Sequence, residues 1–79
     1  MAGTLRTLDL SFNLLTNFDN IEMVFNLREL DLSFNQIEDI ETIPKLPNLK
    51  VLKLDFNKIT KIGMIKGLRK LERFSLEGN

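Results

Sequence analysis

Leucines recur along the chain with a fixed period of 22 residues, and polar residues separate them in a constant pattern. Each copy places a large apolar residue at the first, fourth and sixth positions of a nine-residue stretch that ends in asparagine. The four copies occupy residues 5–13, 27–35, 49–57 and 71–79, and the last has Phe74 in place of the second leucine. A period of this length, kept without an insertion, predicts a solenoid of stacked units.

Within each copy, apolar and polar side chains alternate. In the first copy Leu8 and Leu10 alternate with polar residues, which are Thr7, Asp9 and Ser11. This two-residue period is typical of a strand that buries one face. We therefore expect one short strand in each copy.

After each asparagine, the spacing of apolar residues changes to an interval of three. In the second and third units these residues are Ile37, Ile40, Ile43, Leu46 and Leu49, then Ile59, Ile62, Ile65, Leu68 and Leu71. An α-helix turns about 100° per residue, so this interval would spread the side chains around it. A 3₁₀ or polyproline-like path, with about three residues per turn, keeps them on one side. We expect all of them to lie in the core.

This pattern resembles the intracellular leucine-rich repeats of the 22-residue class, typified by a regulatory subunit of protein phosphatase 1. Axonemal, dynein-associated members of the class also look similar. The resemblance covers residues 5–79 and implies an α/β fold: a right-handed coil with parallel strands on its concave face and 3₁₀ or irregular segments on its convex face. It divides a single domain, residues 1–79, into units 5–26, 27–48 and 49–70 and a partial unit 71–79.

The composition argues against several classes of function. The chain has neither cysteine nor histidine, which removes disulfides, the common catalytic triads and the usual zinc ligands. No glycine-rich phosphate loop is present, and a carboxylate pair such as Asp9 and Asp31 on a shallow open face would not be desolvated for acid–base chemistry. We expect no enzyme activity, no cofactor and no metal site.

Segments that would address the chain to a membrane are also missing from the sequence. No stretch approaches the roughly 18 consecutive apolar residues of a membrane span, and the first residues lack the apolar core of a signal peptide. We expect an intracellular, cytoplasmic protein whose partner is neither a membrane nor a nucleic acid.

The charges cancel in number but are sorted along the chain. Residues 1–40 carry two basic and seven acidic side chains, for a net charge of −5, and residues 41–79 carry nine basic and four acidic ones, for +5. Because a solenoid extends along one axis, this pattern predicts an axial charge separation.

The strand residues that alternate with the buried leucines should face solvent on the concave side. They are Thr7, Asp9, Ser11, Glu29, Asp31, Ser33, Val51, Lys53, Asp55, Arg73, Ser75 and Glu77, with a net charge of −3. Asp9 and Asp31 share a column on neighbouring strands, where a cationic partner would relieve their repulsion. The simplest interpretation is a solvated polar face, and the functional alternative is a docked basic peptide or helix.

A column of phenylalanines precedes the asparagines: Phe12, Phe34 and Phe56, with Gly78 in the fourth copy. Strands about 4.8 Å apart would let these rings pack along the solenoid. The column is either a structural ladder at the concave rim or an exposed strip that grips a partner. The candidate partner-binding residues are therefore Asp9, Phe12, Glu29, Asp31, Phe34, Lys53, Asp55, Phe56 and Arg73.

Asparagines form the last column of the motif. They are Asn13, Asn35, Asn57 and Asn79. Where a strand turns into the next segment, buried backbone groups need partners, and one asparagine amide offers both donors and an acceptor. We expect a structural asparagine ladder.

A basic stretch, KITKIGMIKGLRKLER at residues 58–73, holds six basic side chains and one acidic one. By itself it resembles an amphipathic helix for a membrane or a calmodulin-like groove. The repeat register favours a basic convex patch instead, formed by Lys66, Arg69 and Lys70, that recruits an acidic partner.

Both ends of the chain look uncapped, because few residues precede Leu5 and the chain stops at Asn79. We expect a segment of a larger leucine-rich repeat domain that acts as a non-catalytic scaffold for a protein partner. The alternative is a structural or designed module that forms homo-oligomers end to end.

Overall fold

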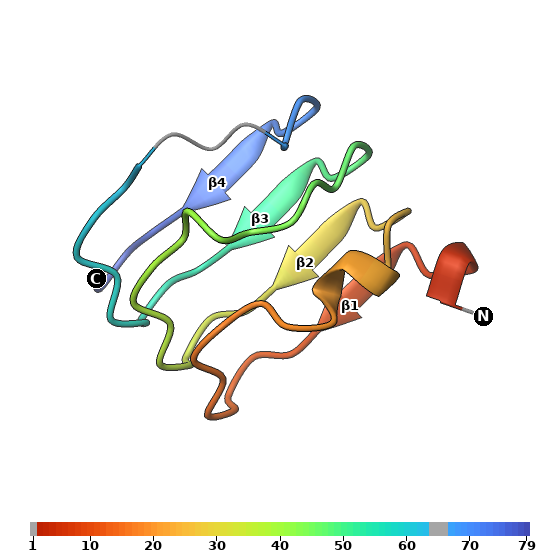
Figure 1. Cartoon of the computed structure of the whole chain (residues 1–79). Helices are drawn as coiled ribbons and strands as arrows, with labels where there is room; N and C mark the ends of the chain where they lie inside the picture. The colour runs from red at the N-terminus through yellow and green to blue at the C-terminus, as the bar shows by residue number, and fades with distance from the viewer. Residues whose placement is uncertain (1, 64–66) are drawn as a thin grey trace.

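The computed structural model describes residues 2–63 and 67–79. Its strands, β1 (Thr7–Asp9), β2 (Glu29–Asp31), β3 (Val51–Lys53) and β4 (Arg73–Ser75), form one parallel sheet in sequence order. Figure 1 shows the strands side by side, with the connecting segments crossing one face of the sheet. One strand in each copy of the motif, in this order, confirms the predicted solenoid.

The strand register follows the sequence period. Leu8 pairs with Leu30, Leu30 with Leu52, and Leu52 with Phe74, a step of one period each time. Pairing continues past the strand ends: the Leu10 amide donates to the Asp31 carbonyl at 2.8 Å. Neighbouring units are therefore nearly superimposable in their strand halves.

The connecting segments are less regular than the strands. The two helices of the described residues are 3₁₀ turns, η1 (Ala2–Thr4) and η2 (Ile21–Met23), and only η2 lies on the convex side, in the first unit. The second and third units instead have bends and an isolated parallel bridge between Asp39 and Lys61. The prediction of 3₁₀ or irregular convex segments is confirmed.

Strand leucines and convex isoleucines and leucines form one core. The fully buried side chains are Leu27, Leu30, Leu32, Ile37, Ile40, Leu46, Leu49, Leu52 and Leu54. All of them lie between residues 27 and 54, in the second unit and the strand half of the third, where a unit has neighbours on both sides. Partly buried residues such as Leu8, Leu15 and Leu76 extend this core outward.

The prediction for the convex core is wrong at Ile62. This side chain is 63% exposed, whereas Ile40, one period earlier, is completely buried. Ile40 lies between two convex segments, and Ile62 has a described neighbour on one side only. Ile65 and Lys66 lie outside the described residues, so the expectations for them remain predictions.

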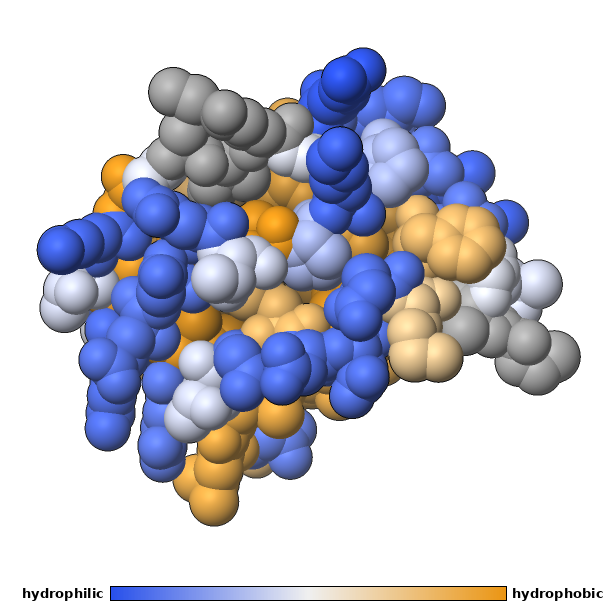
Figure 2. Space-filling model, viewed as in Figure 1, coloured by the Kyte–Doolittle hydropathy of each residue, from blue (hydrophilic) through white to orange (hydrophobic). Residues whose placement is uncertain are grey.

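Hydrophilic side chains cover much of the face seen in Figure 2, with hydrophobic ones visible between them. In the part of the chain that the structure describes, no helix is long and apolar enough to cross a membrane.

Candidate functional site

The exposed face of the sheet carries a groove across the strands. Its first part is lined by Thr7, Leu8, Asp9, Glu29, Leu30, Asp31, Val51 and Lys53. A second depression shares Glu29, Val51 and Lys53 with the first and continues over β4 to Arg73 and Ser75. The two depressions therefore form one groove, which we call the concave groove, that runs from β1 to β4.

Charge changes sign along the concave groove. The strand register places Asp9, Asp31, Lys53 and Ser75 in one column. A second column, two residues earlier, contains Glu29 and Arg73. The groove is thus acidic over β1 and β2, and over β3 and β4 it carries two cations, Lys53 and Arg73, with one carboxylate, Glu72.

Asp9 is held in its ionised form. Its Oδ1 atom accepts hydrogen bonds from the Ser11 hydroxyl at 2.6 Å and the Ser11 amide at 2.9 Å. These two bonds lower the pKa of Asp9 below its ordinary value of 3.8, and the positive charge of Lys53 adds to the effect. Asp9 therefore presents a carboxylate at the outer strand.

The other aspartates of the predicted site are tied to backbone groups. Asp31 Oδ1 accepts from the Ser33 amide at 3.0 Å. Asp55 accepts from the Glu77 amide at 2.7 Å and from the Ser75 hydroxyl at 3.1 Å, so it joins the third and fourth units. Ser33, expected to face solvent, is buried, because its short side chain lies between neighbouring units on both sides.

The phenylalanine strip, which we define as Phe12, Phe34 and Phe56, lies just beyond the carboxyl ends of the strands. Phe12 and Phe34 stack with centroids 4.3 Å apart, and Phe34 and Phe56 stack at 4.7 Å, with the ring planes within 15° of parallel. The exposed fractions of the three side chains are 74%, 42% and 44%. The strip is therefore both a continuous stack and an exposed surface.

The backbone of the strip is in an unfavourable region. Phe12, Phe34 and Phe56 have φ angles of 58°, 58° and 55°, in the left-handed region that bulky side chains rarely occupy. Each such residue costs about 1 to 3 kcal/mol, whereas each stacked pair returns about 0.5 to 1.5 kcal/mol beyond the apolar area that it buries. A glycine, as at position 78, would avoid this backbone cost.

Gly78 closes one end of the strip. It adopts the same left-handed conformation, with φ of 75°. A Cβ atom on Gly78 would stand 2.3 Å from the Phe56 ring, so the ring lies directly over this residue. Phe34 is covered on both faces by the neighbouring rings, and the strip therefore exposes mainly ring edges.

Asparagine side chains connect each unit to its neighbour. Asn35 Nδ2 donates to the carbonyls of Leu10 at 3.0 Å and Leu32 at 2.9 Å, and its Oδ1 accepts from the Leu15 amide at 3.0 Å. Asn57 repeats these bonds one period later, and Asn79 donates to the Leu54 carbonyl at 2.8 Å. Among the described residues, Asn13 donates within its own turn alone, to the Leu10 and Ser11 carbonyls.

A second row of side-chain hydrogen bonds lies before the strands. Asn26 Nδ2 donates to the Gly3 carbonyl at 2.6 Å, Asn48 Nδ2 donates to Asn26 Oδ1 at 3.1 Å, and Lys70 Nζ donates to Asn48 Oδ1 at 3.5 Å. Sequence reasoning missed this row. The spacing of Asn26, Asn48 and Lys70 by one period is the signal that would have found it.

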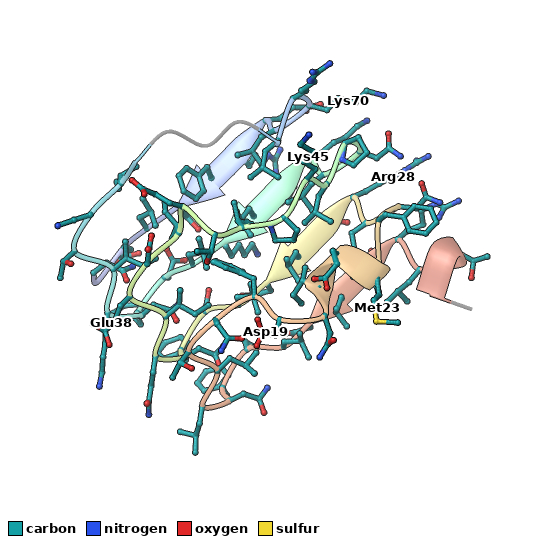
Figure 3. All side chains as sticks on the ribbon, in the orientation of Figure 1. Asp19, Met23, Arg28, Glu38, Lys45 and Lys70 are labelled. Atoms are coloured by element: carbon teal, nitrogen blue, oxygen red, sulfur yellow. The ribbon has the colours of Figure 1, made fainter. Side chains whose placement is uncertain are left out.

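Cations gather at the edge of the sheet where the strands begin. Figure 3 shows Arg28, Lys45 and Lys70 grouped at this edge, with Glu38 at the opposite one. Arg69 and Lys70, expected on the convex face, lie in the turn directly before β4. Two residues of the predicted basic patch therefore lie next to this edge, whereas Lys66, the third, lies outside the described residues.

Side chains suited to metal binding do not converge in this structure. Among residues 2–63 and 67–79, no group of three or more acidic side chains has the geometry to hold a metal ion.

Comparison with known proteins gives a single result. A family model described as "Leucine Rich repeats (2 copies)" matches residues 4–45 and again residues 25–67. The two overlapping matches cover more than half of the chain. No curated protein and no solved structure matches it.

Proposed function

The chain belongs to the leucine-rich repeat family, and from that membership we propose that it is a non-catalytic scaffold that binds a protein partner in the concave groove. Repeats of this family generally mediate protein–protein interaction. The observation that carries the proposal is the continuous groove over β1 to β4, whose acidic part contains Asp9, Glu29 and Asp31.

The proposed occupant of the acidic part is a basic peptide or helix. Asp9 and Asp31 are register partners, and Lys53 beside Asp31 offsets part of their charge; a further positive charge that binds over β1 and β2 would relieve the rest of their repulsion. Lys53 and Arg73 at the other end orient the partner, because they disfavour further positive charge over β3 and β4. Asp55 is already used between two units and contributes less to the partner.

Binding of a labelled lysine-rich helical peptide, followed by fluorescence anisotropy, tests this proposal. Removing three charges in the groove (D9N, E29Q and D31N together) should weaken binding at least about tenfold, and the affinity should fall with rising salt. The matched control removes three acidic charges outside the groove (D19N, E38Q and E41Q). Equal losses in both variants, or no loss in the groove variant, would show that the groove is not the site.

The finer resemblance to the intracellular 22-residue class supports a second part of the proposal. We propose a cytoplasmic location, favoured by the absence of cysteine and histidine from a chain that carries exposed charged side chains. Fluorescence microscopy of the tagged chain checks it, and an extracellular signal would contradict it.

Self-association is the second candidate function. Leu5, Ile62 and Phe74 of the outer units are exposed apolar side chains, and the two halves of the chain carry opposite charge. Sedimentation velocity at several salt concentrations separates this function from the first. A mass that stays monomeric at all concentrations would eliminate self-association and leave the scaffold proposal intact.

A further inference from the structure

We infer that the phenylalanine strip is a docking ledge for aliphatic side chains, so that the partner of the concave groove is an amphipathic helix with a basic side and an aliphatic side. This inference rests on the proposed function and names the partner's chemistry. Three observations carry it: the backbone conformation of the strip, the orientation of its rings and its distance from the acidic part of the groove.

The backbone conformation carries a cost that glycine would avoid, which points to a use for the rings beyond folding. All three phenylalanines occupy left-handed positions, and the fourth position of the column holds glycine, which adopts this conformation without steric cost. Their side chains remain between 42% and 74% exposed. Strained, exposed aromatic residues that repeat at every position of a strip are typical of a surface that contacts a ligand.

The orientation of the rings selects the kind of side chain that binds. Phe34 is sandwiched between two rings, and Phe56 between Phe34 and Gly78, so the edges of these rings face solvent. A ring edge carries partial positive charge and a ring face partial negative charge, so an edge repels cations and accepts aliphatic groups. Phe34 and Phe56 therefore favour the partner's aliphatic side chains, and its basic side chains bind the acidic groove.

The spacing between the two surfaces fits a helix. Asp9 and Phe12 are three residues apart, as are Asp31 and Phe34. The Cα atoms of each such pair are therefore at most about 10 Å apart. A helix with its side chains is about 10–12 Å wide, and its turns are about 5.4 Å apart. A helix that crosses the strands would thus present one side to Asp9 and Asp31 and another to the strip, with a ring near each turn.

Two synthetic helical peptides of equal length and charge test the inference. Both carry the same row of lysines; one has leucines along the adjacent face and the other has glutamines there. The unmodified chain should bind the leucine peptide at least about tenfold more tightly, as the burial of several apolar side chains requires. Equal affinities would contradict the proposed role of the phenylalanine strip but not that of the acidic groove. Binding of neither peptide would contradict both proposals.

Variants of the phenylalanine strip test whether the strip causes the preference for the leucine peptide. In the double variant F12N/F34N the new side chains tolerate left-handed backbone, so the fold should be retained, as checked by circular dichroism. It should lose the preference for the leucine peptide and bind the glutamine peptide within about twofold of the unmodified chain. The control I62N removes an equally exposed apolar side chain outside the strip and should keep the preference.

A preference that survives in F12N/F34N would overturn the assignment to the strip. If this variant unfolds, the single variant F12N replaces it, because Phe12 is the most exposed ring and stacks on one side only. An unchanged preference in F12N would then be the contradicting result.

Discussion

The second unit and the first unit share one sequence motif but differ in what the motif contributes. In the second unit Leu30 and Leu32 are fully buried, and Asn35 is buried and joined to the first unit by its side-chain hydrogen bonds. In the first unit Leu8 is only half-buried, and Asn13 is exposed and bonds within its own turn. The difference shows that the energetic value of a repeat position depends on having a neighbour on both sides.

The largest difference in stability is expected between variants of two isoleucines one period apart, Ile40 and Ile62. I40A should lower the free energy of unfolding by about 3 kcal/mol, because it leaves a cavity in a fully buried site. I62A should cost less than about 1 kcal/mol, since the side chain is already exposed. Urea unfolding followed by circular dichroism measures both, and similar losses would show that the inner and outer units are equally packed.

The asparagine column provides the next test. N35L should destabilise the chain by about 1 to 3 kcal/mol, because the buried carbonyls of Leu10 and Leu32 lose their side-chain donor and the Leu15 amide loses its acceptor. N13L should change stability by no more than about 0.5 kcal/mol, because its hydrogen bonds lie at an exposed turn. If thermal unfolding of N35L matched that of the parent, the structural role of the column would be wrong.

Two glycines that approach a neighbouring segment should differ in how well they tolerate a methyl group. A Cβ atom on Gly67 would lie 2.7 Å from the Lys45 Cα atom, whereas one on Gly3 would lie 3.2 Å from the tip of the Phe25 ring. G67A should therefore cost about 1 to 2 kcal/mol, and G3A should be neutral within about 0.5 kcal/mol, since the half-exposed ring can move. A neutral G67A would mean that the third convex segment separates easily from the second.

The smallest expected effect concerns Asp9 on the outer strand. Folding lowers the pKa of Asp9 below 3.8, so the ionised carboxylate stabilises the fold at pH values above the pKa that Asp9 has in the unfolded chain. This contribution is lost as the pH falls through the pKa of Asp9 in the folded chain. S11A removes the hydroxyl donor, so the pKa of Asp9 should rise toward 3.8 in a carboxyl NMR titration. An unchanged pKa would assign the shift to other groups.

The periodic part of the structure could be predicted from the sequence because a repeat imposes the same local solution on every copy. Alternation at Leu8 and Leu10 predicts a strand, and the fixed period predicts parallel pairing of one strand with the next. The exposure of Ile62 could not be predicted in this way, because the motif records side-chain type and not the number of neighbours.

The candidate site was less accessible from the sequence. The columns of Asp9 and Asp31, and of Phe12 and Phe34, follow directly from the period. The left-handed backbone of the phenylalanines and the edge exposure of their rings depend on backbone geometry, for which Gly78 was the only sequence signal. Arg69 and Lys70 lie in the turn before β4, a position that the interval of three along the convex segments does not indicate.

The constant strand register has a consequence for how the chain folds. Every strand pairing closes a loop of 22 residues, since Leu8 meets Leu30 and Leu30 meets Leu52. Closing a flexible loop of that length costs about 3 kcal/mol in chain entropy, and the cost is the same for each turn. The first pair of strands must overcome this entropy cost without an ordered neighbour to pack on, whereas each later turn packs on strands that are already ordered. Folding should therefore begin at one junction and spread outward turn by turn, with the outermost turns the last to form and the first to fray.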